Sequence, residues 1–395
     1  MRAALISLPG VEGEASAIVA GRSVAARQLD FALACGCELV VVHGHGASRE
    51  AIALRHRAEA AGARFQTITH AQALIGLVGE GDSLLALQPG LLPAAPAAIA
   101  DLAEGARVLV LPAGPGVLAG FERIDLDRAW AGALVVPGHL LARLATLPED
   151  IAPAPALLRV ALQNRVAETR LPPGAIEDGS WTLLRSPEQA RAFESGWLRR
   201  AAGLGGGSAL SRRIAGLVLH RRGGALAEQR WAGAGLLGGF VLTLIAALAA
   251  ARFAQPWLAF ALVALAAPVG EAAIGLARIR AAPFGSARHW PKLRHLVDAT
   301  LGVCAVLTIE GLWYRSLFGP VVLIAGLVLL DRRALAPRMQ WMRDRGVVAA
   351  ALAALAGLAM PEPAVMALAV LVLGGLVLAD NRAPPGKRAP TPDGG

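Results

Sequence analysis

The sequence predicts an α/β domain with a mostly parallel sheet, followed by an all-α domain of six transmembrane helices. Three observations predict this. In residues 1–203, short apolar runs alternate with segments of helical periodicity, which is typical of parallel strands joined by crossover helices. In residues 231–380, six apolar runs follow one another. A glycine-rich stretch, Ala201–Ser208 (AAGLGGGS), separates these two halves and marks a domain boundary.

Charge separates the halves as clearly as hydropathy does. The chain is 55% hydrophobic and 17% charged, whereas soluble proteins carry about 25% charged residues. Residues 1–207 hold 18 Lys and Arg against 20 Asp and Glu, a net charge of −2; residues 208–395 hold 20 against 9, a net of +11. A basic half made of apolar runs is typical of a membrane protein with interfacial arginines. With only 5% aromatic residues, it is not typical of a nucleic-acid binder.

The first domain is expected to alternate strands and helices from its first residues. Strands are predicted at Ala3–Leu8, Glu38–His43, Arg64–Ile68, Ser83–Leu87 and Arg107–Leu111, and helices at Val24–Ala34, Ala47–Ala61, Pro93–Leu102 and Leu157–Gln163. Such sheets bind ligands at the carboxyl ends of their strands, so a phosphate would be held by the loop Pro9–Arg22. That loop has three glycines but no P-loop lysine. No signal peptide is apparent, and three cysteines indicate no disulfide framework.

This half resembles the nucleotidyltransferases that load a sugar or polyol onto a nucleotide. The resemblance rests on Gly21-Arg22-Ser23-Val24 and on the segment ACGCELVVVHG, which matches a helix end and second strand. It implies a site for CTP at Gly10, Gly21, Arg22 and Gln88. Gln88 stands where the family has a metal-binding Asp, and a neutral amide is a poor ligand for Mg²⁺. An active nucleotide site and a retained fold without chemistry therefore both remain open.

The second half begins with residues 204–230, which are expected to form a glycine-rich linker and a basic amphipathic helix on the membrane surface. The six apolar runs are Trp231–Ala251, Trp257–Ala277, Leu296–Trp313, Phe318–Leu330, Val347–Met360 and Ala364–Ala379. The first three approach the roughly 20 residues that a helix needs to cross the hydrocarbon. Residues 381–395 are expected to form a disordered cytoplasmic tail.

Basic residues alternate between the loops that join these runs. Five precede the first run, five lie in the second loop, five in the fourth, and three in the tail, whereas the odd-numbered loops hold only Arg252 and Arg315. The positive-inside rule therefore predicts six spans in a bacterial-type inner membrane, with both termini in the cytoplasm.

The second half resembles the CDP-alcohol phosphatidyltransferases. The resemblance rests on the six runs, the basic helix before them, and Pro283-Phe284-Gly285 at the end of the second loop. It implies transfer of a phospho-alcohol or phosphatidyl group from a CDP-linked donor, with two metal ions held by four aspartates, in a homodimer. Some members carry a fused nucleotidyltransferase domain, as in the bifunctional phospho-inositol enzymes, and the order of the halves here matches that fusion.

The metal-binding motif of that family is largely absent. Counting from Gly285, its four Asp positions carry Pro268, Glu271, His289 and Leu293. One carboxylate cannot hold two divalent ions, because their mutual repulsion requires several negative ligands. We therefore predict no metal site, and Mg²⁺ or Mn²⁺ would act only if the metal chemistry survives in another form.

A cluster of polar residues remains around Glu271, which is the catalytic candidate. The predicted substrate-binding residues are Arg278, Arg280, Arg288, His289, Lys292, Arg294, His295 and Asp298. One interpretation is an anion pocket for a lipid phosphate or a nucleotide pyrophosphate, and the other is an ordinary positive-inside loop. Glu271 within an apolar run favours a functional role, since ionisable groups inside a membrane are costly and usually paired.

We expect a membrane protein of phospholipid head-group metabolism, and three hypotheses follow. It is a divergent phosphatidyltransferase, a non-catalytic lipid- or nucleotide-binding partner that scaffolds an active transferase, or a small-solute transporter. The expected partners are membrane lipid, a CDP-linked donor or CTP, and a second copy of the chain, but not nucleic acid.

Overall fold

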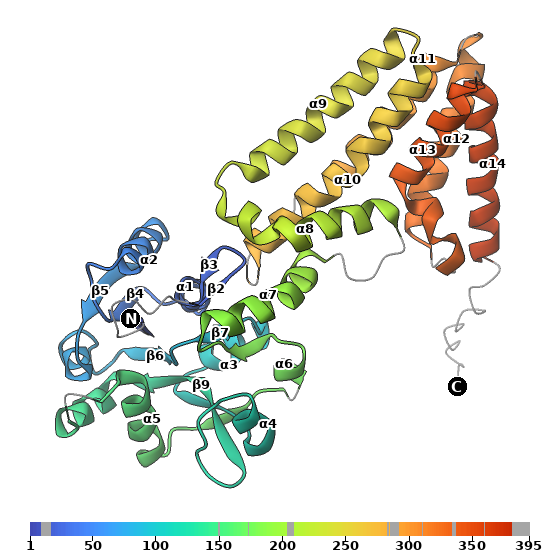
Figure 1. Ribbon diagram of the computed structural model, residues 1–395. Helices are drawn as coiled ribbons and strands as arrows, with labels where there is room; N and C mark the ends of the chain where they lie inside the picture. Colours follow the sequence, from blue (N-terminus) through green and yellow to red (C-terminus); the bar gives the residue numbers. More distant parts are fainter. Residues whose placement is uncertain are drawn as a thin grey trace, which may run out of the picture. The chain divides into compact units, whose positions relative to one another are not determined.

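The chain forms two compact units (Figure 1). The computed structural model describes residues 1–8, 17–148, 151–172, 174–203, 209–282, 284, 292–309, 311–333, 337–358 and 360–380. Unit 1 comprises Met1–Trp197 with Ala281–Ser286, and unit 2 comprises Leu198–Arg280 with Ala287–Gly395. Unit 1 is the α/β part and unit 2 the helical part, and each is described by itself.

Unit 1 is built on a seven-stranded sheet in the order β10-β8-β9-β6-β1-β4-β5. Every neighbouring pair is parallel except those of β9, which is antiparallel to both β6 and β8. The strands are β1 (Arg2–Ser7), β4 (Leu39–His43), β5 (Arg64–Ile68), β6 (Ser83–Leu87), β8 (Arg107–Pro112), β9 (Arg128–Pro137) and β10 (Glu168–Arg170). Two small pairs complete the unit: β2 (Ile18–Val19) with β3 (Arg22–Ser23), and β7 (Leu91–Pro93) with β11 (Trp181–Leu183).

Helical elements cover both faces of this sheet. The helices are α1 (Val24–Ala34), α2 (Arg49–Ala60), α3 (Pro96–Ala103), α4 (Ala113–Leu118), α5 (Pro153–Gln163), α6 (Gly174–Glu177) and α7 (Pro187–Ala202), with 3-10 segments η1 (Ala71–Gly76) and η2 (Gly138–Thr146). In β1, Ala3 and Leu5 face the core formed with η1, η2 and α5, whereas Ala4 and Ile6 face the cores formed with α1, α2 and α3. The four parallel pairings confirm the predicted mostly parallel sheet. The alternation shows that both faces of the sheet are covered, because successive side chains of a strand point to opposite faces.

The strand β9 is the main element of unit 1 that the sequence did not predict. Its first half alternates alanine with Trp130 and Gly132 rather than presenting a β-branched run. Gly132 has φ of 81°, and the register with β8 shifts between Val108 and Val110, which marks an irregularity in the ladder. A glycine in a strand interior weakens the strand pattern, so the segment carried little signal.

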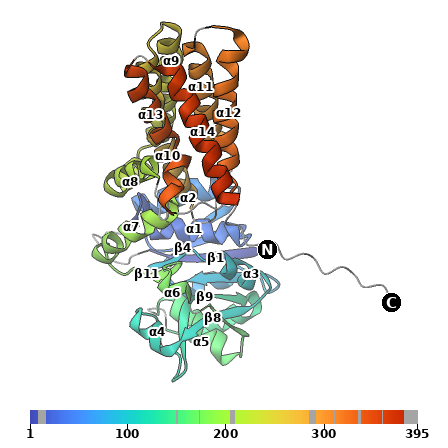
Figure 2. The same ribbon diagram turned by 90° about the vertical axis from the view of Figure 1, so that its right-hand side faces the viewer.

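The described residues of unit 2 form helices and no strands. Its helices are α8 (Leu210–Glu228), α9 (Ala232–Arg252), α10 (Pro256–Ala281), α11 (Lys292–Thr308), α12 (Trp313–Asp331), α13 (Arg345–Gly357) and α14 (Pro361–Asp380), with a 3-10 segment η3 (Pro337–Arg343). Figure 2 shows α11, α12, α13 and α14 running alongside one another. Phe240, Phe260, Leu301, Leu323 and Leu352 form the fully buried centre of one continuous core.

The six predicted spans need correction. Helices α9 to α14 follow the six apolar runs, but among the described residues only three are long and apolar enough to cross a membrane: Ala232–Arg252, Pro256–Ala281 and Pro361–Leu378. Ser316–Asp331 and Arg345–Gly357 are shorter apolar helices. In α11 the predicted run loses its last turn, because the helix ends at Thr308 rather than continuing to Trp313.

Candidate anion-binding site

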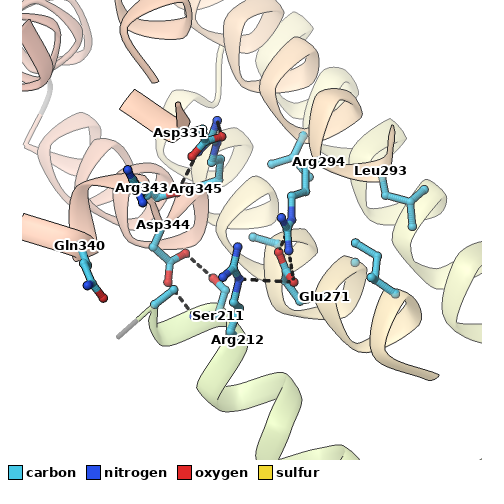
Figure 3. A pocket seen from close by; sticks show the side chains of 15 residues that line it. Ser211, Arg212, Glu271, Leu293, Arg294, Asp331, Gln340, Arg343, Asp344 and Arg345 are labelled. Carbon is cyan, nitrogen blue, oxygen red and sulfur yellow. Dashed lines mark hydrogen bonds and ion pairs between the residues drawn. The ribbon is translucent and has the colours of Figure 1, made fainter. Parts of the chain in front are cut away.

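A cavity of about 360 Å³ lies at one end of the helical unit. Figure 3 shows its walls, which come from the first turn of α8, the middle of α10, the start of α11 and the connection from α12 to α13. Its charged lining residues are four arginines and three carboxylates: Arg212, Arg294, Arg343, Arg345, Glu271, Asp331 and Asp344. The site is therefore rich in charge, and the pairing of these groups decides what it can bind.

Glu271 is already paired on both of its oxygens. Arg294 donates from Nε to Oε1 at 2.7 Å and from Nη2 to Oε2 at 2.9 Å, which is a bidentate pair. The Nε of Arg212 lies 3.8 Å from Oε2. The Glu271 side chain is 12% exposed, so it meets the cavity between two guanidinium groups. This is the partner expected of a carboxylate within an apolar helix.

Asp344 joins α8 to α13. It is the N-cap of α13, and its Oδ1 accepts a hydrogen bond from the Gly346 N–H at 2.9 Å. The same carboxylate accepts from the Ser211 N–H at 2.7 Å and from the Ser211 hydroxyl at 2.5 Å. Because Ser211 and Asp344 are both buried, these bonds fix the first turn of α8 against the first turn of α13.

Arg345 connects three helices through an ionic triad in which Arg345 and Asp298 are buried and Asp331 is exposed. It bonds Asp298 of α11 from Nε at 2.7 Å and from Nη2 at 3.1 Å. It also donates from Nη1 to Asp331, at the end of α12, at 2.9 Å. Removing either Arg345 or Asp298 would leave the charge of the other buried residue without its main partner, so this pair is a structural part of the cavity wall.

Two arginines of the lining are less completely paired than the others. Arg212 has Glu271 only at 3.8 Å, and Arg343 donates from Nε to the Leu330 carbonyl at 3.0 Å. Among the described residues, Arg343 Nη2 is a buried nitrogen without a hydrogen-bond partner. The cavity therefore offers guanidinium donors for an oxyanion, and such groups match phosphate geometry well.

The structure brings some of the predicted site residues together and separates others. Glu271 and Arg294 line the cavity, and Asp298 lies behind its wall on Arg345. Lys292 and His295 are exposed on α11 and are not part of the lining. Arg288 and His289 lie outside the described residues.

Arg278 and Arg280 lie at helix ends rather than in the cavity. Arg278 Nη1 donates to the Ala202 carbonyl of α7 at 3.4 Å. Arg280 Nη2 donates to the Leu226 and Gln229 carbonyls at the end of α8, at 3.0 and 2.5 Å. Cations at helix C-termini satisfy the last carbonyls, so these arginines act as caps.

The motif residue Phe284 does not mark the site either. It belongs to unit 1, where its ring lies 5.5 Å from the ring of Phe31 and packs on a core cluster of the sheet. Counting back from Pro283-Phe284-Gly285 led to Glu271, which lines the cavity, although Phe284 itself does not. Pro283 and Gly285 lie outside the described residues.

Three of the four predicted nucleotide-binding residues of unit 1 lie in the described part of the chain. Gly21, with φ of 73°, and Ala20 form the two-residue turn between β2 and β3, a conformation that favours glycine. Arg22 pairs with Asp30 at 3.1 Å. Gln88 follows β6, and its carbonyl accepts a hydrogen bond from Gln28 Nε2 at 2.8 Å. Gly10 lies outside the described residues.

The donor set of the cavity does not suit the two divalent ions implied by the family resemblance. Across the described ranges, no three His, Cys, Asp or Glu side chains are grouped so as to hold a metal ion. The carboxylates of the cavity instead bind guanidinium, hydroxyl or backbone N–H groups. Two adjacent divalent ions require several carboxylate oxygens that are free to coordinate.

Several residues of the site were not predicted from the sequence. They are Ser211, Arg212, Asp331, Arg343, Asp344 and Arg345. Arg212, Arg343 and Arg345 were assigned only to the positive-inside pattern. A usable signal was Asp344-Arg345-Gly346 before an apolar run, because Asp is a preferred N-cap and few acids occur in this half.

Solved structures resemble about half of this chain, at low sequence identity. No protein-family model, including any for CDP-alcohol phosphatidyltransferases, and no curated protein matches this chain significantly. The UDP-glucose pyrophosphorylase from Acinetobacter baumanii is similar at 12% identity and a TM-score of 0.36, over 51% of this chain and 94% of that chain. A UDP-glucose pyrophosphorylase complexed with UDP-glucose is similar at 12% identity and a TM-score of 0.34, over 49% and 98%. At these values no substrate or activity follows for this chain.

Proposed function

We propose that the protein is an integral membrane protein of phospholipid head-group metabolism whose helical unit binds a phosphate-containing ligand. The ligand is the phosphate of a lipid head group or the pyrophosphate of a CDP-linked donor. The proposal treats the helical unit as a divergent CDP-alcohol phosphatidyltransferase in which arginines take the place of the metal ions as the charge clamp.

One observation carries this proposal. The cavity holds four arginines, and one of them, Arg212, lies only within 3.8 Å of Glu271. A guanidinium group at this distance from its carboxylate can donate hydrogen bonds to the oxygens of a phosphate ligand. The exposed apolar side chains of α9, α10 and α14, the three candidate spans, support placement of this unit in a membrane.

The direct test is a transferase assay with a binding arm. The full chain, purified and reconstituted in vesicles, is given CDP-diacylglycerol and candidate alcohols, with and without Mg²⁺ or Mn²⁺, and CMP release is measured. Calorimetry with cytidine diphosphate and with inorganic phosphate then separates a nucleotide-linked ligand from a bare phosphate. We expect binding of at least one of them, and the proposal is wrong if neither binds and no CMP is released.

A second candidate function is supported by the pairing of the carboxylates. Glu271, Asp298 and Asp331 all bond arginines, so none is free to act as a base. A non-catalytic partner that binds a lipid or nucleotide and scaffolds an active transferase needs the pocket but no base. Binding of cytidine diphosphate without CMP release would favour this candidate over the transferase.

For unit 1 we propose a nucleotidyltransferase-like fold that binds CTP no tighter than about 1 mM. This is supported by the pairing of Arg22 with Asp30 and by the neutral Gln88 after β6. Calorimetric titration of the full chain with CTP, monitored separately from cytidine diphosphate, tests it.

A further inference from the structure

Helix α8 presents two different faces along its length. Its buried face is made by Ser211, Ala215, Leu219 and Gly223, spaced four residues apart. Its outer face carries Leu210, Ile214, Leu217 and Val218, which are 43–53% exposed. The spacing i, i+4, i+7 and i+8 places these four on one stripe of the helix, so the stripe is a continuous apolar surface.

The exposed part of α8 is also basic. Arg213, His220, Arg221 and Arg222 are exposed along the helix, and its acidic residue is Glu228 in the last turn. An apolar stripe with flanking arginines is complementary to an anionic lipid surface, where each arginine adds to the attraction.

The first turn of the same helix enters the anion-binding cavity. Ser211 is bonded to Asp344, and the next residue, Arg212, lies 3.8 Å from Glu271. Arg213, which faces outward, follows directly. Any displacement of α8 relative to α13 must therefore strain the Ser211–Asp344 bonds or move the Arg212 guanidinium within the cavity.

We propose that α8 rests on an anionic lipid surface and that this contact sets the position of Arg212, so that the charge of the membrane surface regulates anion binding in the cavity. The inference rests on the proposed function of the cavity. It adds a regulator, the anionic head groups of the surrounding bilayer, and a physical route through the first turn of α8.

The lipid contact is tested with the full chain in vesicles of phosphatidylcholine alone or of an equal mixture with phosphatidylglycerol. An environment-sensitive fluorophore is attached to Leu217→Cys, and the matched control is Ile52→Cys on α2, which is similarly exposed. The native cysteines are buried and do not compete for the label. We expect a blue shift of the Leu217 label in anionic vesicles and none for the control. An equal response of the two labels overturns the lipid contact.

The regulatory step is tested by the affinity for cytidine diphosphate in both vesicle types. An anionic surface repels this ligand equally in all variants, so the informative quantity is the ratio of the two dissociation constants. We expect this ratio to differ by about fivefold between the wild type and the double variant Arg213→Gln/Arg221→Gln, whose residues do not line the cavity. If the wild type and the double variant give the same ratio, the regulatory inference is wrong and the proposed function of the cavity is unaffected. Absence of cytidine diphosphate binding in every vesicle overturns the regulatory step, while the Leu217 label still reports the lipid contact. The proposed function is overturned with it only if inorganic phosphate also fails to bind and no CMP is released.

Discussion

At the residue scale, Glu271 decides between an anion pocket and a metal or base site. Arg294 donates two hydrogen bonds to Glu271, so an incoming anion must compete with this carboxylate for the guanidinium group. We predict that Glu271→Gln tightens binding of cytidine diphosphate by about tenfold, because the competing charge is removed. Calorimetry of the reconstituted variant measures this.

The opposite result has a clear meaning. If Glu271 coordinated a metal that holds the ligand, the same substitution would weaken binding instead of strengthening it. Any CMP release by the wild type should be abolished by Glu271→Gln if the carboxylate acts in the reaction. Comparing the two readouts therefore separates binding from chemistry at a single residue.

The buried thiols of unit 1 allow a prediction about pH. Burial raises the pKa of Cys35 to about 11 and that of Cys37 to about 12, from an ordinary value of 9.0. The reactive thiolate is therefore scarce in the folded unit, and we predict no reaction of either cysteine with a thiol reagent at about pH 8 until the protein is unfolded. The measurement is a thiol titration before and after denaturant.

The same raised pKa values have a consequence for stability. The folded unit holds these protons more tightly than the unfolded chain does. The contribution of the two thiols to the free energy of unfolding is therefore fully present below about pH 9. It declines as the pH rises toward the folded values of 11 and 12. A thiol that reacts quickly in the native protein would contradict the burial on which both statements depend.

At the element scale, arginines at helix ends differ from arginines in the cavity. Arg280 caps the carbonyls of α8, whereas Arg294 starts α11 and faces Glu271. We predict that Arg294→Gln weakens binding of cytidine diphosphate by about tenfold, through loss of a charge-assisted donor. Arg280→Gln should leave binding unchanged and lower the unfolding temperature, as seen by circular dichroism. Equal losses of binding in the two variants would show that position in the cavity does not matter.

The sequence predicted elements better than contacts. It placed α1 at Val24–Ala34 and β6 at Ser83–Leu87 with the bounds found in the structure, because caps and buried apolar runs are local signals. It could not distinguish Arg280 from Arg294, since both lie near one loop and only the packing of α8 and α11 decides which carbonyl or carboxylate each one meets. Asp344 was missed for a related reason, because its partner Ser211 lies far away in the sequence.

At the scale of the whole molecule, helix length and the distribution of arginines both bear on how the helical unit crosses a membrane. Three helices have the length and hydropathy of spans, while α13, with 13 residues, is roughly 20 Å long against about 30 Å of hydrocarbon. Arginines nevertheless alternate between successive loops across all six helices, and short helices can cross where the bilayer thins. We therefore predict that both termini lie in the cytoplasm, which requires an even number of crossings. Fusions of green fluorescent protein to each terminus should both fluoresce, and alkaline phosphatase fused at either end should be inactive.

Three crossings would place the C-terminus on the opposite side, making a C-terminal phosphatase active. Three crossings by α9, α10 and α14 would still leave the arginines of the α12–α13 connection on the same side of the membrane as those of α8, because two crossings separate them. Both sets of arginines line one cavity, so the packing of unit 2 agrees with either number of crossings, and the fusions at the C-terminus distinguish them.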